Sequence, residues 1–224
     1  MTSAAAGDDE LALVMAGCRA SHARLLDTVA GLDDATVRSP SRLEGWSVGH
    51  VLAHLSANAD AHAGMLGAAA RGEAVEAYPG GPGARAEGIA ARAGADPAAL
   101  RDEVRRSAAD LEAAWAAMTP EAWEGHGLTR GRPWPCRTLP YARWREVEIH
   151  HVDMGTGYEP TAWPDDYVAR ELRLTVAGLP DRVADAGQRR RLLAWLVGRA
   201  GDPGSLDVAA WESSRSHYLR GMTS

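Results

Sequence analysis

The sequence predicts a mainly α-helical protein: an antiparallel four-helix bundle with a small appended C-terminal α(+β) unit. In four long segments, apolar residues recur at intervals of three and four, the period of one face of a helix. The joints between these segments contain Gly, Pro and Ser, which end helices. With 224 residues, the chain can bury a core without a disulfide or a metal. We therefore expect a bundle over residues 1–159 and a smaller unit over residues 160–224.

The first two helices are predicted over residues 9–31 and 47–70. In the first, Asp8 or Asp9 is suited to cap the start and Gly31 to end the helix. Its inward stripe is formed by Leu11, Val14, Met15, Cys18, His22, Leu25, Leu26 and Val29. Ser47 is a good N-cap residue for the second helix.

The remaining bundle helices are predicted over residues 84–118, with a break near "GADP", and over residues 138–154. Between them, the loop of residues 119–137 is long enough to cover a site. After the bundle, residues 167–177 and 187–201 have helical patterns, and the rest of the C-terminal unit leaves room for a strand or two at most.

Composition narrows the class of partners. The net charge is -6 and the pI is about 5.7, so the chain has no overall positive field to attract nucleic acid or an anionic membrane. The acidic N-terminus does not resemble a signal peptide and no apolar run is long enough to span a bilayer. We expect a cytoplasmic protein. Its two cysteines, Cys18 and Cys136, form neither a disulfide framework nor a metal motif.

Histidines and glutamates in two of the helices suggest a metal site. Glu146 and His150 are four residues apart and therefore share one helix face. The second predicted helix carries recurring polar residues, namely His50, His54, Asn58 and His62. One of its histidines together with Glu146 and His150 would give two imidazoles and one carboxylate, a set that leaves positions open for substrate.

Two other interpretations of these residues are open at this point. Glu146 and His150 can form a buried ion pair without any metal. Glu148 and His151 form the Glu-x-x-His step of di-iron bundles, although no second such step occurs in the sequence.

Three segments, "GWSVGHVLAHLSANADAH", "YPGGPGARAEGI" and "RWREVEIHHVDMGTGYEPTAWP", resemble the mycothiol-dependent maleylpyruvate isomerase family, and "LLAWLVGRAG" resembles part of its C-terminal domain. The resemblance implies a DinB-like four-helix bundle that holds a divalent metal, usually zinc, through His54, Glu146 and His150. It also implies mycothiol as thiol cosubstrate and a small anionic substrate, with isomerisation of maleylpyruvate to fumarylpyruvate or of a related cis-enedioate.

The resemblance also assigns further residues. Arg85 is expected to bind the anionic substrate, and Arg215 is the candidate for a second arginine from the C-terminal unit. Asn58 and His62 are candidate contacts of mycothiol. Family members carry a fuller C-terminal domain, so this part is expected to be shortened here.

Two alternative functions keep the same metal residues. One is a mycothiol S-transferase acting on another electrophile, and the other is a non-catalytic metal-binding stress or regulatory protein. The choice among zinc, nickel and iron and the choice between monomer and homodimer are open from the sequence.

Overall fold

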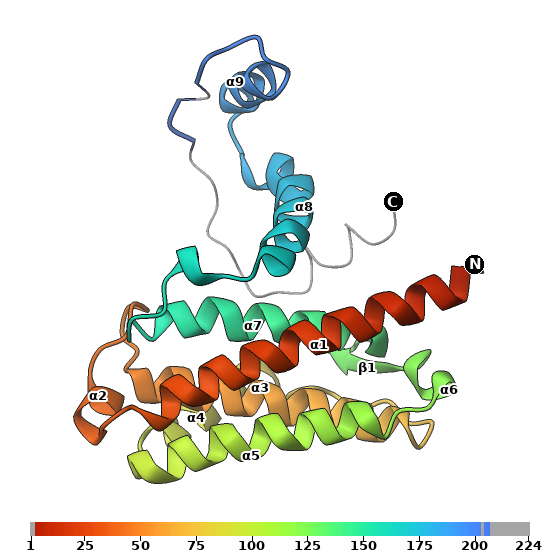
Figure 1. Cartoon of the computed structure of the whole chain (residues 1–224), viewed down its shortest axis with the longest axis vertical. Helices are drawn as coiled ribbons and strands as arrows, with labels where there is room; N and C mark the ends of the chain where they lie inside the picture. The colour runs from red at the N-terminus through yellow and green to blue at the C-terminus, as the bar shows by residue number, and fades with distance from the viewer. Residues whose placement is uncertain (1–2, 203, 207–224) are drawn as a thin grey trace. The chain divides into compact units, whose positions relative to one another are not determined.

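The computed structural model describes residues 3–202 and 204–206 and is mainly helical (Figure 1). Its α-helices are α1 (Ser3–Ala30), α2 (Asp34–Arg38), α3 (Val48–Ala69), α4 (Gly81–Ala93), α5 (Pro97–Ala116), α6 (Pro120–Trp123), α7 (Leu139–Asp153), α8 (Asp165–Arg182) and α9 (Ala186–Leu196). The strands are β1 (His126–Thr129) and β2 (Arg132–Pro135), and the 3-10 helices are η1 (Cys136–Thr138) and η2 (Pro160–Ala162). Contacts between residues divide the chain into two compact units, and the boundary in the sequence lies between Trp163 and Pro164.

The first unit is a bundle of the four long helices α1, α3, α5 and α7, which confirms the predicted fold class. Helices α1 and α7 run in one direction and α3 and α5 in the other (Figure 1). Helix α3 packs against α5, α4 and α7, and α1 packs against α7 and α5. Most side chains of α3 are buried, so this helix forms the centre of the core.

The predicted start of α3 is confirmed, whereas that of α1 is wrong. The Ser47 side chain accepts from the backbone N–H of His50, and the His50 ring accepts from the backbone N–H of Ser47, so the two residues form a capping box. Helix α1 begins at Ser3, and Asp8 and Asp9 therefore lie inside it. The alanines that precede them have the highest helix propensity, which accounts for the longer helix.

The segment predicted as a loop over residues 119–137 contains α6 and a β-hairpin. Strands β1 and β2 pair antiparallel around Arg130 and Gly131, which both have positive φ, as tight hairpin turns require. Prolines in β2 weaken the strand signal, since they cannot donate to the ladder, and this explains why the hairpin was missed. The hairpin packs on α3, where Gly127 meets Met65.

The second unit contains α8 and α9, in agreement with the predicted helices although both have different bounds. No strand occurs in the described part of this unit. None of the described helices of either unit is long and apolar enough to cross a membrane.

Two glycines inside bundle helices allow a test of the packing. A Cβ on Gly17 of α1 would lie 2.3 Å from the Trp144 ring, whose indole N–H is held by Ser21, whereas a Cβ on Gly64 of α3 would meet nothing within 4 Å. We expect Gly17→Ala to lower the free energy of unfolding by about 1–3 kcal/mol through overpacking. The control Gly64→Ala should raise it by about 0.5–1 kcal/mol, because alanine is the better helix former. Urea unfolding measures both, and stabilisation by Gly17→Ala would contradict the close contact.

Candidate metal centre

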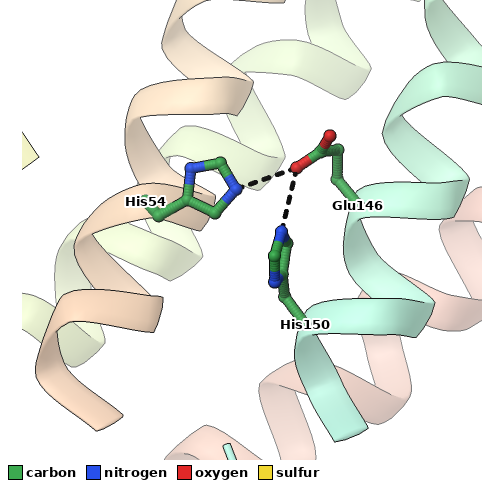
Figure 2. A group of neighbouring side chains, drawn as sticks. All are labelled: His54, Glu146 and His150. Carbon is green, nitrogen blue, oxygen red and sulfur yellow. Dashed lines mark hydrogen bonds and ion pairs between the residues drawn. The ribbon is translucent and has the colours of Figure 1, made fainter. Parts of the chain in front are cut away.

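The side chains of His54, Glu146 and His150 meet between α3 and α7, and all three are buried (Figure 2). The His54 Nε2 lies 2.8 Å from the Glu146 Oε2, and the His150 Nε2 lies 3.3 Å from the same oxygen. The two imidazole rings stand edge to face with centroids 4.5 Å apart. The structure therefore brings together the three residues predicted as metal ligands.

Local sequence explains this arrangement. One helical turn of α7 separates Glu146 from His150, so both side chains lie on the face directed at α3. His54 lies in the buried middle of α3, which runs antiparallel to α7. Each helix alone supplies only part of the set, and the packing of α3 on α7 completes it.

The second nitrogen of each imidazole also has a partner. The Nδ1 of His150 lies 2.8 Å from the Asp153 Oδ2. The Nδ1 of His54 accepts from the Arg85 Nη2 at 2.9 Å, and the Arg85 guanidinium lies 5.0 Å from the centre of the Tyr78 ring. Such outer partners orient a ring, and here they direct both Nε2 atoms toward Glu146.

Burial and neighbouring charges shift the pKa values of all three residues. Burial lowers the pKa of His54 and favours its neutral form. Burial would also lower the pKa of His150, but contacts with the carboxylates of Asp153 and Glu146 outweigh it and raise this pKa to about 9. Burial acts to raise the pKa of Glu146, yet its contacts with His150 and His54 hold it well below the usual range. Glu146 is therefore an anion at neutral pH.

The donor set fits a divalent metal ion. One atom from each residue can be chosen so that all lie within 4.8 Å of one another. The His150 Nε2 is buried and has no hydrogen bond of good geometry. Buried polar atoms normally have a partner, so this nitrogen is suited to bind a metal. Two imidazole nitrogens and one carboxylate oxygen are ligands that zinc accepts, and three protein ligands leave a position open.

The structure places the other predicted site residues as follows. Arg85 reaches the centre through His54. Asn58 and His62 are buried one and two turns farther along α3, and Asn58 accepts from Arg143. Arg215 lies outside the described residues, so its role stays a prediction.

The remaining histidines and glutamates considered from the sequence have other partners. His50 belongs to the capping box of α3. Glu148 accepts from Arg24 at 2.9 Å and from the Tyr158 hydroxyl at 2.6 Å, while the His151 ring stacks on Tyr158. These contacts tie α1 and the segment after α7 to α7, and they engage both carboxylate oxygens of Glu148, which a di-iron site would need.

Both cysteines are buried, and burial raises the pKa of each thiol, that of Cys136 to about 11. A thiol with a raised pKa is a poor nucleophile at neutral pH. Cys18 contributes to the apolar core, as predicted from its helical stripe.

The sequence prediction missed Asp153, Tyr78 and Arg143. The position of Asp153 three residues after His150 is a signal that could have been read, because such a spacing allows contact on a helix. Tyr78 lies outside any helix, so no periodicity indicated its contact with Arg85. Arg143 is fully buried, and charged residues are usually expected at the surface.

The raised pKa of His150 predicts how the metal-free protein responds to pH. A histidine whose pKa is raised by folding stabilises the folded state when protonated; this contribution is complete below pH 6.5 and is lost as pH rises toward about 9. We expect the free energy of unfolding of chelator-treated protein to fall by on the order of 2 kcal/mol over this range. The pKa values of His22, His54, His62 and His151 are lowered, so they act only below pH 6.5.

The matched variant is Asp153→Asn, which removes one of the two carboxylates that raise the pKa of His150. Between pH 6.5 and about pH 9, this variant should lose less free energy of unfolding than the unaltered protein. The control Asp102→Asn, at an exposed position, should behave like the unaltered protein. Equal losses in all three proteins would contradict the assigned contact.

Comparison with known proteins gives the chain a family. Residues 18–155 match the mycothiol maleylpyruvate isomerase N-terminal domain. A crystal structure of the mycothiol-dependent maleylpyruvate isomerase is similar, with a TM-score of 0.70, 32% identity and coverage of 79% of this chain and 72% of that chain. A histidine-to-alanine variant of that enzyme gives a TM-score of 0.69 and 31% identity with the same coverage. Among curated proteins, no significant match was found. The chain belongs to the mycothiol-dependent maleylpyruvate isomerase family.

Proposed function

We propose that this protein is a metal-dependent isomerase that uses mycothiol to convert maleylpyruvate, or a related cis-enedioate, to its trans isomer. The observation that carries the proposal is the buried set of His54, Glu146 and His150, next to a guanidinium suited to an anionic substrate. Family membership supports the reaction type. We propose zinc as the metal, bound by these three side chains.

The thiol of mycothiol is the proposed nucleophile. A divalent metal in this site would lower the pKa of a coordinated thiol and so supply a thiolate at neutral pH. The thiolate adds to one carbon of the cis double bond, and the electron pair moves to the adjacent carbonyl to give an enolate. The former double bond is now a carbon–carbon single bond. Rotation about it, followed by return of the electron pair and expulsion of the thiolate, gives the trans product. The two buried cysteines of the chain take no part.

Arg85 is the proposed partner of a substrate carboxylate. In the structure its Nη2 donates to the His54 Nδ1, so the ring proton of neutral His54 is on Nε2. A metal needs that Nε2 without a proton, and the proton of the neutral ring is then on Nδ1. With a metal on Nε2, the Nδ1 of His54 would carry the proton and could no longer accept, so the Arg85 guanidinium would be available to a carboxylate.

We also propose that residues 160–224 form a separate C-terminal unit and that Arg215 of this unit is a second arginine that binds the substrate. Asn58 and His62 were expected to contact mycothiol. Both are buried residues of α3, one and two turns beyond His54.

Replacement of Arg85 tests whether an anionic substrate is handled. Arg85→Ala should lower kcat/KM for mycothiol-dependent isomerisation of maleylpyruvate by about 100-fold, the usual effect of losing a charged hydrogen bond. Arg71→Ala is the control, since Arg71 is exposed and pairs with Glu73. Absorbance assays of the substrate follow the rate. Unchanged turnover in Arg85→Ala would argue against the assigned carboxylate contact, and absence of isomerisation in the unaltered protein would direct attention to S-transfer with other electrophiles.

The cysteines provide a second test. The Cys18→Ala, Cys136→Ala double variant should retain mycothiol-dependent turnover within about twofold, after allowance for the stability lost when buried groups are removed. Loss of turnover in a folded double variant would show that a thiol of the chain takes part.

A further inference from the structure

A second polar group lies beside the metal ligands and is not explained by them. Arg143 precedes Glu146 by one helical turn on α7, and Asn58 follows His54 by one turn on α3. The Arg143 Nη1 donates to the Asn58 Oδ1 at 2.9 Å and to the backbone carbonyl of Leu55 at 2.7 Å. Arg143 and Asn58 therefore form the next layer of the α3–α7 contact.

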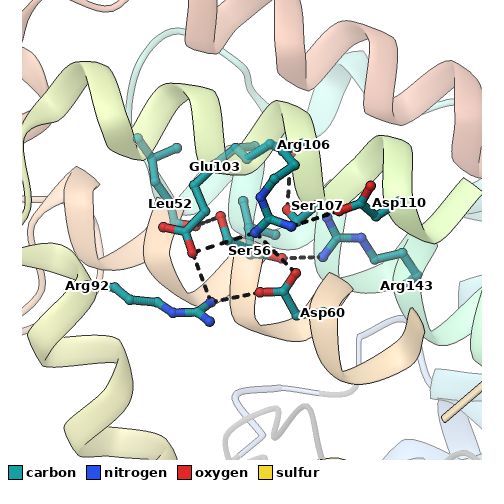
Figure 3. Close-up of polar contacts among 11 residues, drawn as sticks. Leu52, Ser56, Asp60, Arg92, Glu103, Arg106, Ser107, Asp110 and Arg143 are labelled. Atoms are coloured by element: carbon teal, nitrogen blue, oxygen red, sulfur yellow. Dashed lines mark hydrogen bonds and ion pairs between the residues drawn. The ribbon is translucent and has the colours of Figure 1, made fainter. Parts of the chain in front are cut away.

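Arg143 is a buried cation without a direct counterion. Its side chain is fully buried, and none of the described carboxylates forms an ion pair with it. Figure 3 shows it reaching from α7 toward α3, on which the acidic residue Asp60 is already engaged by Arg92 at 3.1 Å and by Arg106 at 3.4 Å. Buried charges are normally paired, so the absence of a partner suggests that Arg143 serves a ligand.

The guanidinium is nevertheless held in one orientation. Its Nε donates to the His22 Nε2 at 3.0 Å, and the His22 Nδ1 lies 2.7 Å from the Glu112 Oε1. Because Arg143 can only donate, the His22 proton is on Nδ1 and points to Glu112. The Nε and Nη1 of Arg143 are therefore both hydrogen-bonded. The remaining nitrogen, Nη2, is buried without a hydrogen-bond partner.

Two more buried nitrogens in this region lack partners. His62 lies one turn beyond Asn58, and its Nδ1 has no hydrogen bond. The indole of Trp134, from the hairpin, meets the His62 ring edge to face with centroids 5.4 Å apart, and its Nε1 is also unpartnered. Burial, followed by the charge of Arg143, lowers the pKa of His62 to about 3, so its ring is neutral and retains one N–H.

We propose that Arg143, His62 and Trp134 form an internal carboxylate-binding site one layer from the metal ligands. Arg143 and Trp134 can only donate hydrogen bonds, and His62 can donate from Nδ1. A carboxylate accepts several hydrogen bonds and neutralises a guanidinium, so it is the class of ligand that suits these donors. This inference rests on the proposed function: it assigns the site to one carboxylate of the substrate, leaves the other to Arg85, and takes His62 as a substrate contact in place of the mycothiol contact expected from the resemblance. His22 and Glu112 are positioning residues that act through Arg143.

Calorimetric titration of zinc-loaded protein with maleate, a stable cis-dicarboxylate, tests this site. Trp134→Phe removes one N–H and should weaken maleate binding by about tenfold; Arg143→Lys should weaken it by about 30-fold, through loss of the fixed guanidinium fork. The controls Trp163→Phe and Arg24→Lys remove comparable groups bound to Glu148 and should bind as the unaltered protein does.

Several results would overturn the inference. Unaltered maleate affinity in Trp134→Phe and Arg143→Lys, with only the melting temperature changed, would mean that buried water serves these nitrogens. Absence of maleate binding to the unaltered protein would also overturn it. Zinc content, measured on every sample, reports separately on the proposed function, because Trp134 and Arg143 are not metal ligands. A protein without zinc whose maleate affinity still falls in both variants would retain the carboxylate site and lose the metal proposal.

Discussion

The contact between α3 and α7 is the constraint on which the rest of the structure depends. Through it, two histidines and one carboxylate are held together in a region where water is excluded. Burial of a charged group is costly unless a partner is present, so Glu146 requires both His54 and His150. The same requirement extends outward to Asp153 and Arg85, each of which fixes one ring. The packing of α3 on α7 and the geometry of the site therefore depend on the same side-chain contacts.

Helix α7 differs from an ordinary amphipathic helix because charged residues lie on several of its buried faces. Glu146 and His150 face α3, whereas Glu148 faces α1 and accepts from Arg24. Each face obtains its own hydrogen bonds, which keeps the buried groups satisfied. Several buried polar atoms of the described residues have no hydrogen bond, and those in the layer beyond His54, Glu146 and His150 include nitrogens of Arg143, His62 and Trp134. Unsatisfied groups in that place are consistent with binding of a ligand rather than with support of the fold.

Much of the bundle could be predicted from the sequence, because α1 has a clear apolar stripe and Ser47 is a strong cap for α3. The ligand pair on α7 could be predicted from helical spacing alone, and the choice of His54 came from the family resemblance. What could not be predicted depends on tertiary contacts. The β-hairpin is stabilised by packing on α3 despite its prolines, and the partners of Arg143 come from two separate helices, α1 and α3. Local propensity carries no information on either feature.

The most direct test of the account is the metal content of the purified, untagged protein beside a Glu146→Gln variant, measured by elemental mass spectrometry after equilibration with zinc. Glu146→Gln keeps the size of the side chain and removes the charge shared by both histidines. The account predicts about one equivalent of zinc in the unaltered protein and a large loss in the variant, since a carboxylate is one of only three protein ligands. Equal metal content in the two proteins, or none in either, would show that Glu146, His54 and His150 form only a buried ion-paired cluster.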